Sequence, residues 1–79
     1  MARVRIGDIM RECALSRAKT TYYTAFGLLK TVGKFDTGAN LYDLDETIKR
    51  VNMIKELKSK RLMLKEIKKE LDKKFSRRT

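Results

Sequence analysis

The sequence has no histidine and only one cysteine, Cys13, and both shortages exclude chemistry. Histidine is the commonest general base and metal ligand, and a lone cysteine forms neither an intrachain disulfide nor a thiolate cluster. The acidic residues Asp43, Asp45 and Glu46 cluster at the expected start of a helix, where carboxylates interact favourably with the helix dipole. We therefore predict that the protein is not an enzyme and has no catalytic residue, cofactor or metal ion. Cys13 is predicted to be a small buried hydrophobe.

Long apolar segments are absent as well. No stretch approaches the roughly 18 apolar residues of a membrane-spanning helix, and the basic N-terminus lacks the apolar core of a signal peptide. We expect a cytoplasmic, nucleoid-associated protein with no membrane partner. Its 79 residues allow one small domain, since a chain of this size buries only roughly 60% of its unfolded surface.

Positive charge is what the sequence has in excess. It contains 20 Lys and Arg against 10 Asp and Glu, for a net charge of +10. Residues 1–48 hold seven basic and six acidic residues, whereas residues 49–79 hold thirteen and four. Such a field attracts polyanions, chiefly nucleic acid, although a merely solvated lysine-rich helix surface is the alternative. We expect the six aromatic residues to belong mostly to the core or to the hairpin, which favours duplex DNA over single-stranded RNA.

Two short helices are predicted near the N-terminus. Ser16 is a helix-capping residue whose hydroxyl can accept a hydrogen bond from the amide of Lys19, and Gly27 can adopt the left-handed conformation that ends a helix. These signals predict a helix over 17–26. An extended start at 3–5 and a short amphipathic segment from Gly7 precede it, joined to it by Cys13-Ala14-Leu15. Two helices connected in this way form a helix-turn-helix.

The rest of the chain predicts a hairpin and two longer helices. Apolar or β-branched runs at 28–32 and 39–42 flank turn-forming residues, which favours a β-hairpin. Asp43, with Glu46 three residues later, begins the next helix. Its predicted core positions recur at helical spacing: Leu44, Ile48, Val51, Ile54 and Leu57. After a break around 59–62, Leu64, Ile67 and Leu71 are expected to face inward from a last helix.

The predicted site lies on the second helix. In a helix-turn-helix the N-terminal residues of that helix meet base edges in the major groove. Side chains suited to bases lie there, and the predicted base-reading residues are Arg17, Ala18, Thr20 and Thr21. Residues 22 and 23 point about 100° apart on a helix, and we expect Tyr22 to pack inside and Tyr23 to face phosphates. A polar helix face without function is the alternative.

The motifs "RIGDIM", "SRAKTTYYTAFGLLK", "GANLYDLDE" and "IKELKSKRLMLKEIKKEL" occur in this order between residues 5 and 71. In order and spacing they resemble the DNA-binding domain of the MerR family of bacterial regulators. The resemblance implies a mostly α fold with a small β-hairpin wing: a winged helix-turn-helix of the MerR type with four helices. It also implies that the hairpin contacts the DNA backbone and that the turn between the last two helices is a second wing.

Together these features predict one DNA-binding domain over residues 1–75. It is divided into the helix-turn-helix at 7–27, the wing hairpin at 28–42, and helices at 43–59 and 63–74. Residues 76–79 are expected to be a disordered basic tail.

The sequence departs from the family pattern at several positions. Thr21 stands where an arginine usually precedes the tyrosine pair, and Ala14 and Arg61 replace glycines of the two helix connections. Other residues are expected to supply the phosphate contacts, namely Ser16, Lys19, Tyr23, Lys30, Lys34, Asn40, Lys60 and Arg61.

The sequence ends soon after the fourth predicted helix. From this we expect no dimerisation helix, no effector domain and no small-molecule effector, and a monomer in solution that can pair cooperatively on DNA. The leading hypothesis is a sequence-specific double-stranded DNA-binding protein that acts as a small transcriptional regulator. The alternatives are an excisionase-like DNA architectural factor and a protein-interaction adaptor that reuses the fold.

Binding to duplex DNA is predicted to depend steeply on salt, because phosphate contacts release counterions. If the protein neutralises about four to six phosphates, the logarithm of the association constant should fall against log salt with a slope of about −4 to −5. Titration of a labelled duplex at several salt concentrations measures this slope. A flat plot would contradict a charge-driven DNA binder.

Overall fold

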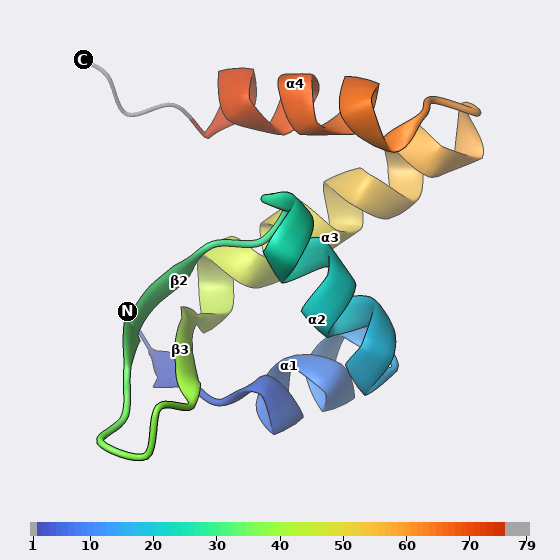
Figure 1. Ribbon diagram of the computed structural model, residues 1–79. Helices are drawn as coiled ribbons and strands as arrows, with labels where there is room; N and C mark the ends of the chain where they lie inside the picture. Colours follow the sequence, from blue (N-terminus) through green and yellow to red (C-terminus); the bar gives the residue numbers. More distant parts are fainter. Residues whose placement is uncertain (1, 76–79) are drawn as a thin grey trace.

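Four helices and three short strands make up residues 2–75, which are those that the computed structural model describes (Figure 1). Their bounds are β1 (Arg3–Val4), α1 (Ile6–Cys13), α2 (Arg17–Phe26), β2 (Thr31–Lys34), β3 (Asn40–Asp43), α3 (Leu44–Ser59) and α4 (Leu64–Lys74). In Figure 1 the β2–β3 hairpin and the α3–α4 turn lie on opposite sides of α2. The predicted tail at 76–79 lies outside the described residues.

The helix-turn-helix forms as the local signals predict, except that α1 is one residue longer at each end and begins at Ile6 instead of Gly7. The Ser16 hydroxyl accepts a hydrogen bond from the Lys19 amide at 3.0 Å, and Gly27 ends α2 in the left-handed region with φ 96°. The connection from α1 begins one residue later than predicted, because Cys13 is the last helical residue. Ala14 then makes the turn with φ 55° and ψ 47°, and its amide donates to the Met10 carbonyl.

The predicted hairpin is present, but its first strand starts later than expected. Leu28 and Leu29 are not strand residues, because their amides donate to the Tyr23 carbonyl at 2.9 and 3.3 Å and so close the end of α2. Both leucines are buried in the core. The extended start at the N-terminus becomes β1, which pairs antiparallel with β3 and makes β3 the central strand of three. The hairpin is therefore one part of a small sheet.

The third and fourth helices close the core. Asp43 caps α3 by accepting from the Glu46 amide at 3.3 Å, as predicted. Val51 and Ile54 of α3 are buried, as are Ile67 and Leu71 of α4. The buried apolar core to which they belong consists of Ile9, Cys13, Tyr23, Leu28, Leu29, Tyr42, Val51, Ile54, Ile67 and Leu71.

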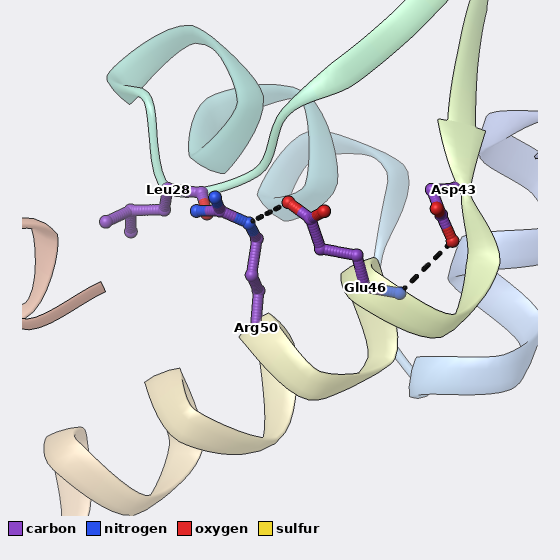
Figure 2. A network of polar contacts seen from close by, with 4 residues as sticks. All are labelled: Leu28, Asp43, Glu46 and Arg50. Carbon is purple, nitrogen blue, oxygen red and sulfur yellow. Dashed lines mark hydrogen bonds and ion pairs between the residues drawn. The ribbon is translucent and has the colours of Figure 1, made fainter. Parts of the chain in front are cut away.

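Arg50 of α3 is buried within this core, and sequence periodicity did not single it out. Figure 2 shows its guanidinium between the carboxylate of Glu46 and the backbone carbonyl of Leu28, at 2.9 Å and 3.1 Å. The guanidinium carbon also lies 4.5 Å from the centre of the Phe75 ring, beyond the end of α4. A buried charge is tolerated only with such partners, so Arg50 joins α3 to the end of α2 and to the end of α4.

The left-handed backbone at Ala14 predicts that Ala14→Gly stabilises the protein. A residue with a Cβ atom is strained there by about 1–2 kcal/mol, whereas the greater unfolded-state freedom of glycine offsets part of the gain. We expect a net increase of about 0.5–1 kcal/mol in the free energy of unfolding, measured by urea denaturation. The control is Ala25→Gly on the exposed side of α2, which should destabilise by about 0.5–1 kcal/mol. Equal losses in both variants would refute the strain at Ala14.

The Arg50 network predicts a large effect from a small change at Glu46. Glu46→Gln keeps the shape of the side chain but leaves the guanidinium without its counter-charge, which should lower the free energy of unfolding by about 1–3 kcal/mol. Asp45→Asn is the matched control, because Asp45 lies exposed in the same first turn of α3 and its carboxylate interacts only with the helix dipole. Urea denaturation of both variants should separate the two effects. A similar loss of unfolding free energy in both variants would mean that Glu46 acts through the helix dipole and not through Arg50.

Candidate nucleic-acid interface

The outward face of α2 carries polar and basic side chains and no acidic one. Arg17, Ala18, Lys19 and Thr21 are all exposed, and Arg17 has no ion-pair partner among residues 2–75. The amides at the start of a helix attract anions, and here no carboxylate in the first turn opposes them. The exposed start of α2 therefore has the charge and the donors that a phosphate or a base edge requires.

Thr20 does not lie on this face, contrary to the prediction that it reads bases beside Arg17. It is fully buried, and its hydroxyl donates to the Ser16 carbonyl at 2.8 Å. The buried side of α2 runs through Thr20 and Tyr23, which are three residues apart and so share a face. Thr20 thus belongs to the packing of α2 against the domain.

The predicted orientation of the two tyrosines was also wrong. Tyr23 is the buried one at 4% exposure, and Tyr22 is 51% exposed with its ring stacked on Phe26 at a centroid distance of 6.0 Å. Both orientations satisfy the rule that neighbouring residues point about 100° apart. The choice depends on which side of α2 meets the core, and only the tertiary packing decides that.

A pocket of about 420 Å³ lies between the start of α2 and the C-terminal half of α3. Lys19, Lys55 and Lys58 line it together with Tyr23. Ammonium groups gathered from two helices are suited to an anionic oxygen.

Sequence reasoning missed Lys55 and Lys58 as members of this pocket. Both belong to α3, far from α2 in the sequence, and Lys55 also donates to the Cys13 carbonyl at 3.0 Å. Their spacing of three residues puts them on one face of a helix, and that was the available signal. Nothing in the sequence alone placed that face opposite α2.

The remaining predicted phosphate contacts lie on two surfaces beside α2. Lys30 and Lys34 are exposed on the hairpin, where Lys34 pairs in register with the half-buried Asn40. Lys60 and Arg61 are exposed in the α3–α4 turn, and Arg61 adopts a left-handed backbone with φ 65°.

Arg5, in the segment between β1 and α1, adds a basic group beside the hairpin that the sequence did not indicate. The guanidinium carbon of Arg5 lies 4.5 Å from the centre of the Phe35 ring near the hairpin tip. This cation–π contact fixes a positive charge on the hairpin surface and connects the tip to the chain before α1.

Metal ligands and the single cysteine were the other groups to place in the structure. Residues 2–75 contain no group of three potential metal-ligating side chains. Burial raises the pKa of the Cys13 thiol, and the nearby Lys55 ammonium opposes this effect only in part. The thiol therefore stays protonated at neutral pH and packs as a hydrophobic group. No described helix is both long and apolar enough to pass through a bilayer.

Comparison with known families identifies this arrangement. Residues 4–74 match the sequence profile described as MerR HTH family regulatory protein, which covers nearly the whole chain. The chain belongs to the MerR family. A comparison with curated proteins finds no significant match. As a MerR domain the protein is a double-stranded DNA-binding, helix-turn-helix module of transcription regulation.

The two positions where the resemblance implied glycine are also the two left-handed non-glycine residues of the described chain. Ala14 makes the turn of the helix-turn-helix and Arg61 makes the turn before α4. Both turns therefore adopt a conformation to which glycine is best suited, although each has a residue with a Cβ atom there. Arg61 in place of glycine also adds a positive charge to the turn between α3 and α4.

Proposed function

We propose that this MerR domain recognises a specific DNA sequence by inserting the start of α2 into the major groove. The observation that carries this proposal is the exposed, acid-free face of α2 between two basic surfaces. Arg17 is the principal base-reading residue, since a guanidinium can pair bidentately with guanine. Ala18 and Thr21 share the exposed face and offer methyl groups to thymine.

We further propose that the pocket beside α2 and the two flanking surfaces hold the phosphate backbone. A phosphate oxygen in the pocket would meet Lys19, Lys55 and Lys58, and Ser16 also lines the pocket. Lys30, Lys34 and Asn40 on the hairpin and Lys60 and Arg61 in the α3–α4 turn would contact the backbone on either side of α2. These contacts set orientation and affinity, and they carry no base information.

We also propose that the protein is a monomer before it meets DNA. Its net charge of +10 repels a second copy, and DNA would remove this repulsion by neutralising the charge. The domain would then act as a small transcriptional regulator whose copies can pair along a site.

The proposed division between base reading and backbone holding predicts different effects of substitution. Arg17→Ala should weaken binding to a cognate duplex by about 1–3 kcal/mol and relax preference at one base position. Replacing Lys60 and Arg61 by alanine should weaken cognate and scrambled duplexes alike and lower the salt slope by about one for each phosphate that the protein no longer neutralises. Fluorescence anisotropy on both duplexes, after selection of a cognate site, measures the two effects.

Thr20→Val is the matched control on α2. It removes a hydroxyl from the buried side of the helix at almost unchanged side-chain size, so it should reduce stability and leave base preference unchanged. The contrary result is that Arg17→Ala lowers the affinities for the cognate and the scrambled duplex equally, while the Lys60 and Arg61 variants change the ratio of the two affinities. In that case the α3–α4 turn, and not α2, would read the bases.

A further inference from the structure

An apolar groove of about 710 Å³ lies between the end of α2 and the start of α4. Phe26 lines it from α2, and the consecutive residues Leu62, Met63 and Leu64 line it from the other side. Met63 is 73% exposed, although its side chain is among the most apolar on the surface. Apolar side chains gathered in one exposed concavity are typical of a binding surface, and exposed methionines adapt to many partners.

The apolar surface continues beyond the groove along α2. Phe26 is stacked on the half-exposed ring of Tyr22, with an angle of 30° between the ring planes. The groove and Tyr22 thus form one strip that spans two helices. The apolar side chains that line the groove, those of Phe26, Leu62, Met63 and Leu64, have no hydrogen-bond donor for a phosphate, so backbone contacts with DNA do not explain the groove.

The rim of the groove is positively charged. Lys58 and Lys65 line it, and neither has an acidic partner in residues 2–75. Glu66 is the one carboxylate at the groove within those residues, and it accepts the Met63 amide at 2.8 Å at the start of α4. A ligand that packed against the apolar side chains of the groove would have its two sides next to the ammonium groups of Lys58 and Lys65.

We propose that this groove binds an acidic amphipathic helix of a partner protein. Such a helix places apolar side chains every three or four residues into the groove and presents carboxylates on either flank to Lys58 and Lys65. A β-strand partner does not fit, because the exposed sheet edges are β1 and β2, and neither contributes to the groove. Peptide binding here requires no DNA, so it is testable separately from base recognition.

The test uses a synthetic helical peptide with leucines at i, i+3, i+4 and i+7 and glutamates on the flanking positions. One control peptide has the same composition in scrambled order, and another has lysine in place of glutamate. Fluorescence anisotropy with the labelled peptides and the full chain should give an affinity about tenfold higher for the acidic amphipathic peptide than for either control. Equal affinities for the three peptides would overturn the proposal.

Variants of the protein locate the binding site. Met63→Ser and Lys65→Glu should each weaken binding of the acidic peptide by about fivefold or more, and Lys65→Glu should also improve binding of the lysine peptide. Val32→Ser is the control, because Val32 is another exposed apolar residue, on the hairpin. Unchanged peptide affinity in Met63→Ser would overturn the proposal.

Two further measurements distinguish other occupants of the groove. Duplex affinity should stay within about twofold of wild type in Met63→Ser, as expected for an exposed apolar side chain that contacts no phosphate. A large loss of duplex affinity with unchanged peptide affinity would instead assign the groove to DNA. A dimer in sedimentation that Met63→Ser abolished would assign it to a second copy of this chain. Either result would overturn the proposal.

Discussion

Arg50 is a buried charge that needs partners inside the protein, and the packing of α2, α3 and α4 depends on the groups that provide them. An unpaired charge in the core costs several kcal/mol. Its partners come from three places: Glu46 one turn earlier in α3, the Leu28 carbonyl after α2, and the Phe75 ring after α4. The burial of Arg50 is therefore favourable only when the ends of α2 and α4 are both in position. The contact with the Leu28 carbonyl lies only a few residues before β2, so it ties α3 to the segment that leads into the hairpin (Figure 2).

Elements whose signals are local could be predicted from the sequence. The bounds of α2 followed from a capping serine and a left-handed glycine, and the start of α3 followed from Asp43 and Glu46. Each of these signals acts within one helical turn, so its energy does not depend on the rest of the chain. The buried stripe of α3 was predicted in the same way, from spacing alone. The family motifs then supplied the order in which these elements pack.

Features that depend on contacts between distant residues could not be predicted. β1 exists because β3 offers it a free edge, and Arg50 is buried because Leu28 and Phe75 surround it. The orientation of Tyr22 and Tyr23 and the burial of Thr20 share one cause, since both follow from the side of α2 that faces the core. Of the residues predicted to read bases, Arg17, Ala18 and Thr21 are exposed on α2 and Thr20 is buried, and Lys55 and Lys58 come to line the pocket beside α2 only through folding.

The outer edge of β2 has a consequence for the behaviour of the protein at high concentration. β2 is an edge strand, all four of its residues are exposed, and its unpaired backbone groups could template a strand from another molecule. An irregularity in its pairing with β3 between Thr31 and Gly33, together with Lys30 and Lys34, works against such pairing, because bulges and lysines disfavour aggregation at sheet edges. The hairpin lysines thus oppose edge-to-edge pairing in addition to contributing positive charge. Removing these lysines would therefore also remove the protection of this edge against edge-to-edge aggregation.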